Sequence, residues 1–119
     1  MLYSLSEDAD LSFLGERELI QVAIGLYQVI FRFDQEVSIS VEDRFEITSK
    51  SETWTWTPGA KNVAESLVSL LGRVVEKVRV LPRSRVELVF SGGMQLVITP
   101  ENHDYESYQI THAKDVFVI

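Results

Sequence analysis

Apolar residues alternate with polar ones along most of the chain, the pattern of β-strands with one buried face. The clearest case is 86–99, where two alternating runs flank Ser91-Gly92-Gly93. Glycine between two such runs is typical of a tight hairpin turn. The same alternation predicts strands at 20–24, 27–33, 37–41, 45–47, 74–80, 105–111 and 116–119. The alternating Trp and Thr residues of 53–57 add a candidate strand.

Between 58 and 71 the apolar spacing changes to three and four residues, which predicts a helix with one apolar stripe. The stripe consists of Ala60, Val63, Ala64, Leu67, Val68 and Leu71. Thr57 and Pro58 suit the start of a helix, and Gly72 suits the position after its end. We therefore expect one helix, at about 58–71, packed on the core.

The stretches 14–48 and 71–111 resemble each other. Val29 and Phe33 match Val86 and Phe90 at an offset of 57 residues, and Leu14-Gly15 matches Leu71-Gly72. The strand at 20–24 fits better with an offset of 56, which one extra residue in the turn at 81–84 explains. Any two meanders share alternating apolar residues, so some similarity is expected by chance. However, a one-residue slip would move every side chain of a strand to its other face, so apolar positions that stay in step across three strands favour a duplication.

These patterns predict an α+β fold that is mainly antiparallel β. Residues 1–119 form a single domain of two repeated β-meanders, with about eight or nine strands and one helix. Residues 1–13 have no clear period and are expected to form an N-terminal arm.

Acidic residues outnumber basic ones 18 to 11, giving a formal net charge of −7. This balance argues against nucleic acid as a partner, because phosphate binding requires clustered Lys and Arg. No apolar run reaches the roughly 18 residues that span a bilayer. The N-terminus is acidic where a signal peptide is basic, so a cytoplasmic location is expected. The chain has no cysteine and therefore no thiol chemistry.

No segment has the form of a catalytic motif. Ser91-Gly92-Gly93 joins strand to strand, whereas a nucleophile elbow joins strand to helix. Phosphate loops and dinucleotide fingerprints are also missing. His103, Asp104, Glu106 and His112 are metal-ligand types, but their spacing matches no established pattern, so a surface loop is favoured. Acidic pairs such as Glu42-Asp43 fall in turns, where solvated acids are common. We expect no catalytic residue, no metal, no cofactor and no enzyme activity.

Aromatic residues give the stronger signal. Trp54, Trp56, Tyr105 and Tyr108 fall in or beside predicted loops, together with Glu106. Trp and Tyr are the residues that most often anchor protein interfaces. These five residues are the candidate binding site. The alternative is that the aromatic rings only close the ends of the sheets.

Three segments carry a family resemblance: the Leu-Gly at 71–72, the hairpin LVFSGGMQLVI at 88–98 and YESYQI at 105–110. Together they resemble a group of small bacterial domains of unknown function, in which Tyr-Glu-x-Trp or Tyr-Glu-x-Tyr follows the second hairpin. The resemblance covers 14–119. Some of these relatives resemble immunity proteins of bacterial toxin systems, which implies a role in binding and blocking a toxin. The resemblance implies no catalytic residues.

The leading hypothesis is a non-enzymatic, cytoplasmic protein-interaction domain, immunity-like in type. Its acidic surface would steer it towards a basic protein partner. One alternative is a small-molecule-binding protein or enzyme with a pocket between sheet and helix. Another is a structural homo-oligomer joined through an edge strand such as 116–119.

Overall fold

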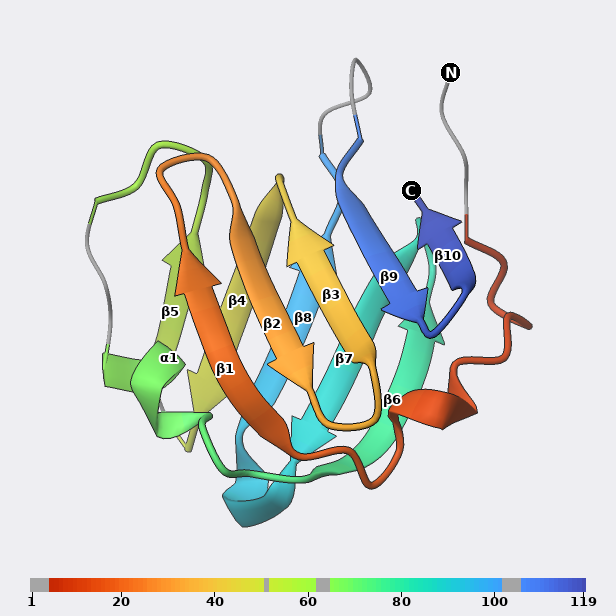
Figure 1. Ribbon diagram of the computed structural model, residues 1–119. Helices are drawn as coiled ribbons and strands as arrows, with labels where there is room; N and C mark the ends of the chain where they lie inside the picture. Colours follow the sequence, from red (N-terminus) through yellow and green to blue (C-terminus); the bar gives the residue numbers. More distant parts are fainter. Residues whose placement is uncertain (1–4, 51, 62–64, 102–105) are drawn as a thin grey trace.

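The computed structural model describes residues 5–50, 52–61, 65–101 and 106–119, which form two five-stranded antiparallel sheets packed face to face (Figure 1). The elements in chain order are η1 (Ser12–Leu14), β1 (Leu19–Ile24), β2 (Val29–Phe33), β3 (Val37–Val41), β4 (Arg44–Ser49), β5 (Glu52–Trp56), α1 (Glu65–Ser69), β6 (Val75–Leu81), β7 (Arg85–Phe90), η2 (Ser91–Gly93), β8 (Gln95–Thr99), β9 (Tyr108–His112) and β10 (Asp115–Val118).

Sheet 1 has the strand order β1-β2-β3-β9-β10, and sheet 2 has the order β5-β4-β8-β7-β6. Each sheet therefore contains one meander and a hairpin from the other half of the chain. After β3 the chain crosses to sheet 2, and after β8 it crosses back to sheet 1. The mainly antiparallel β architecture is confirmed, but so little of the described chain is helical that the α+β label overstates the helix.

The two halves meet through matching backbone hydrogen bonds. The Glu16 N–H donates to the Val75 carbonyl at 2.7 Å, and the Gly72 N–H donates to the Leu19 carbonyl at 2.8 Å. An offset of 56 residues relates the two bonds. A register shift follows Leu19 in β1 and Val75 in β6. β1 and β6 therefore hold equivalent places in the two sheets. The duplication stays a prediction, which this geometry supports.

The connection before β6 follows the same offset of 56. Leu14 and Leu70 are both fully buried, whereas Leu71 is exposed. Glu16 and Gly72 both adopt left-handed backbone, with φ of 66° and 82°. The match of Leu14-Gly15 to Leu71-Gly72 is therefore wrong by one residue, because two leucines and a nearby glycine allow two alignments.

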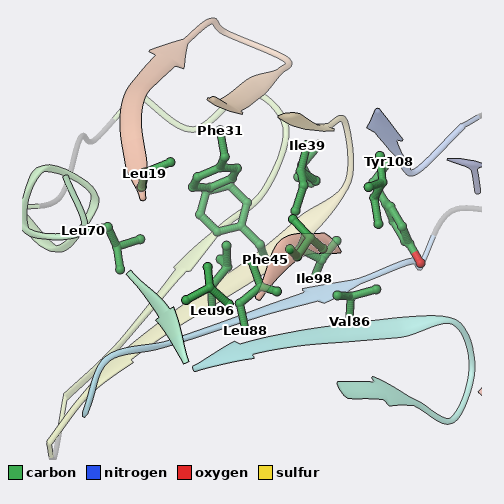
Figure 2. Close-up of a cluster of buried hydrophobic side chains, with 14 of the residues drawn as sticks. Leu19, Phe31, Ile39, Phe45, Leu70, Val86, Leu88, Leu96, Ile98 and Tyr108 are labelled. Carbon is green, nitrogen blue, oxygen red and sulfur yellow. The ribbon is translucent and has the colours of Figure 1, made fainter. Parts of the chain in front are cut away.

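The core lies between the sheets, where the alternating apolar residues of both interdigitate (Figure 2). Phe31 of sheet 1 meets Phe45 of sheet 2 edge to face, with ring centroids 5.3 Å apart. The alternation in 20–24 did not predict burial correctly. Ile20 is 57% exposed and Ile24 is 43% exposed. The register shift between Leu19 and Gln21 changes the phase of the strand, and Ile24 lies on an edge strand beside the turn.

The helix is shorter than the predicted 58–71. α1 covers Glu65–Ser69, residues 58–61 are not helical, and 62–64 lie outside the described residues. Gly59 has a φ of 91°, which a right-handed helix excludes, and its N–H donates to the Leu26 carbonyl at 2.7 Å. This tether to the β1–β2 turn replaces the helical start predicted at Thr57 and Pro58. In the part of the chain that the structure describes, no helix has the length and apolar character to cross a membrane.

Candidate functional site

Two of the predicted binding residues lie in the core. Trp56 is 1% exposed and stacks on Phe45, with ring centroids 5.2 Å apart. Tyr108 is also 1% exposed, and its hydroxyl donates to the Ser84 carbonyl at 2.7 Å. Burial raises the pKa of Tyr108. Neither ring presents surface to a partner. The placement of Trp56 and Tyr108 fits the alternative stated for the aromatic residues, which is a packing role.

The other predicted residues differ in their placement. Trp54 is half-buried on β5, Glu106 is exposed ahead of β9, and Tyr105 lies outside the described residues. Trp54 lies on β5 of sheet 2, whereas Glu106 precedes β9 of sheet 1. A solvent-open hollow lies at Trp54, but neither Trp56 nor Glu106 lines it, so it is not the pocket expected between sheet and helix.

The candidate metal ligands do not form a site in the described chain. His112 stacks on Phe13, with ring centroids 4.4 Å apart, and His103 and Asp104 lie outside the described residues. Within 5–50, 52–61, 65–101 and 106–119, no group of three or more His, Asp or Glu residues is placed to hold a metal ion.

Asp43 is a structural residue that the sequence pattern missed. It is only 5% exposed, although its place in a turn predicts a solvated carboxylate. Its Oδ1 accepts the Arg44 N–H at 2.8 Å, and its Oδ2 accepts the Glu101 N–H at 2.7 Å and the Ser107 hydroxyl at 3.0 Å. Asp43 thus fastens the chain on both sides of 102–105. An acidic residue between two strands gives no sequence signal that its carboxylate accepts hydrogen bonds from residues far along the chain.

The most distinctive surface surrounds α1 and the edge strand β1. Seven large apolar side chains are exposed in the described part of the chain. Six of them belong to β1, to the β1–β2 turn or to residues 65–71, which contain α1. We call these six the α1 surface: Ile20, Ile24, Leu26, Tyr27, Val68 and Leu71. The seventh, Val116, lies on β10 at the opposite edge of sheet 1.

Backbone hydrogen bonds hold the parts of the α1 surface together. The Gly59 N–H donates to the Leu26 carbonyl at one end of β1, and the Gly72 N–H donates to the Leu19 carbonyl at the other. The segment that carries α1 is thereby fastened to both ends of β1. Figure 1 shows α1 beside β1, on the side of the molecule away from β10. The segments that carry these six residues therefore lie at the same edge of the sandwich.

The equivalent edge strand shows that the fold does not require this exposure. At the offset of 56, Ile20 and Ala23 of β1 correspond to Glu76 and Arg79 of β6, both of which are exposed. Charged side chains on an edge strand discourage pairing with another protein. β6 has that protection, whereas β1 has exposed isoleucine. The apolar character of β1 must then be explained by something other than the backbone.

A solvent-open hollow of about 500 Å³ lies next to the α1 surface, between the β4–β5 hairpin and the start of α1. It is lined by Ile47, Ser49, Glu52, Thr53, Trp54, Glu65 and Ser66. Because α1 contributes to both the hollow and the α1 surface, the two features adjoin.

Comparison with known proteins adds a family but no activity. A family model described as a family of unknown function, DUF6188, matches residues 12–119. The chain belongs to this family. The predicted resemblance to a family of unknown function is confirmed at that level. Neither a curated protein nor a solved structure matches the chain of this DUF6188 member. Its function must therefore be argued from its surface.

Proposed function

We propose that this domain is a non-enzymatic protein-binding module that uses the α1 surface to bind a basic protein. The observation that carries the proposal is the contrast between two equivalent edge strands, of which β6 is charged and β1 is apolar. Apolar patches rimmed by polar residues are typical of protein interaction sites.

Charge supports a basic partner. The formal net charge is −7, and the exposed Glu16 and Glu18 lie just before β1. Neither carboxylate forms an ion pair with a described residue. Acidic groups around an apolar patch accelerate encounter with a basic partner, while the apolar contacts slow its dissociation. An immunity-like inhibitor of a basic toxin is the specific form of this proposal.

The test compares three forms of the domain immobilised for capture from host lysate: wild type, Val68→Glu and Val116→Glu. Val68 belongs to the α1 surface, and Val116 is a matched exposed valine outside it. We expect a basic protein to be retained by wild type and by Val116→Glu and to be lost with Val68→Glu.

Calorimetry with the purified partner then gives the magnitude. Loss of one central apolar anchor is expected to weaken binding about tenfold or more, and added salt to weaken it further. Equal binding by Val68→Glu and Val116→Glu would reject the α1 surface. Light scattering distinguishes a protein partner from the homo-oligomer alternative. If wild type is a dimer and Val68→Glu is a monomer, the α1 surface binds a second copy of the chain instead.

A further inference from the structure

The hollow beside α1 has the chemistry of a site for a cationic side chain. Glu52 and Glu65 are exposed at its lining, and neither forms an ion pair with a described residue. Trp54 is half-buried in the same lining and packs edge-on against Phe45, with ring centroids 5.9 Å apart. Carboxylates beside an indole ring are suited to a cation, which both attract.

Ser66 also lies in the lining, and its Oγ, which is shielded from solvent, makes no hydrogen bond with a described residue. Guanidinium fits better than ammonium because its N–H groups can pair with both oxygens of a carboxylate while its plane lies against an aromatic ring.

We propose that the hollow binds an arginine side chain of the basic protein partner. This inference rests on the proposed function, since Glu65 and Ser66 lie on the same short helix as Val68. A partner that covers Val68 therefore has the hollow within reach. The arginine supplies a charged anchor next to the apolar contacts of the α1 surface.

A small probe tests the hollow without the partner. The probe is the peptide acetyl-Gly-Arg-Gly-amide, and the control is the same peptide with citrulline, an uncharged isostere of arginine. Both are titrated into ¹⁵N-labelled domain and followed by amide and indole NMR signals. We expect the arginine peptide to shift the Trp54 indole and the Glu65 and Ser66 amides, with a Kd of about 1 mM or weaker. The citrulline peptide should bind at least about threefold more weakly.

Substitutions identify the groups responsible. Glu65→Gln removes one charge from an exposed position and should weaken arginine-peptide binding about two- to fivefold. Trp54→Leu should have a similar effect through loss of the aromatic face. Glu76→Gln, an exposed acid on β6, should change nothing. Equal binding of the two peptides, or of wild type and Glu65→Gln, would overturn the proposal even if Trp54→Leu failed to fold.

Val68→Glu separates this proposal from the proposed function. Val68 does not line the hollow, so this variant should bind the arginine peptide at least as well as wild type does while losing the protein partner. If the arginine peptide binds but no protein depends on Val68, the protein-binding function fails and the cation site stands. If a protein depends on Val68 but the peptides do not differ, only the arginine site fails.

Discussion

The turns β2–β3 and β7–β8 offer a matched test of how backbone strain limits stability. Gln35 and Glu36 have φ values of 59° and 61°, and their counterparts Gly92 and Gly93 have values of 82° and 83°. Left-handed backbone costs an L-residue about 1–2 kcal/mol, while glycine loses about 0.5–1 kcal/mol more chain entropy on folding. Glu36→Gly should therefore stabilise the domain by about 0.5–1 kcal/mol.

Urea unfolding of wild type and Glu36→Gly measures the effect. The midpoint should rise with an unchanged dependence on urea, because the surface exposed on unfolding stays the same. The side chain of Glu36 is exposed, and its carbonyl, which accepts the Ala113 N–H at 3.1 Å, remains in the variant. The gain thus reports the backbone conformation alone. The melting temperature should rise by roughly 2–6 °C.

The reverse change completes the test. Gly93→Glu should lose a similar amount, since no atom lies within 4 Å of an added Cβ there. Gly92→Glu should lose more, because its Cβ would clash with the Arg73 guanidinium. As a control, Glu76 of β6 has no positive φ, so Glu76→Gly should destabilise. If Glu36→Gly lowered the midpoint, or Gly93→Glu left it unchanged, the strain argument would be refuted.

Two further predictions concern buried polar groups. Tyr108→Phe removes the hydrogen bond to the Ser84 carbonyl and should cost about 1 kcal/mol below pH 9. Burial raises the pKa of Tyr108 above its unfolded value, so the folded state keeps this proton to higher pH. Above about pH 10 the free energy of unfolding of wild type should therefore fall by up to about 1.4 kcal/mol per pH unit, a fall that Tyr108→Phe lacks. Urea unfolding of both forms at pH 8 and pH 11 checks this, and parallel pH profiles would contradict the assignment. Asp43→Ala should destabilise the domain by about 3 kcal/mol or more, because it removes the acceptor of three hydrogen bonds from described residues, two of which are distant along the chain. A loss below about 1 kcal/mol in urea unfolding would show that water replaces the carboxylate.

Strand positions could be predicted because alternation reports which side chains are buried. Val29, Phe31 and Phe33 are all buried in β2, and the hairpin at 86–99 forms with Gly92 and Gly93 in its turn. Alternation does not report which strand pairs with which. Nothing in the pattern of β4 or β9 indicates that each crosses to the opposite sheet, because both are apolar on one face in either arrangement.

The candidate site was harder to predict because it depends on exposure rather than on residue type. The sequence predicts Trp56 and Tyr108 as aromatic anchors, yet each continues the inward phase of its strand and is buried in the core. Trp54 shares the face of Trp56 but lies further from the centre, so it lines the hollow. The strand and helix patterns predict that Ile20 and Val68 are buried. They are exposed because a bulge follows Leu19 and because α1 is short, and the sequence pattern indicates neither feature.

The equivalent places of β1 and β6 make each a control for the other. Where both strands have a buried residue, as at Leu19 and Val75, the sandwich sets the requirement. Where they differ, as at Ile20 and Glu76, the sandwich tolerates either kind of side chain, and the choice reflects what each edge meets. An isoleucine that is more than half exposed gains less from folding than a buried one does, and glutamate at this place would give better solubility. Under the proposed function, Ile20 is buried further when the protein partner covers the α1 surface.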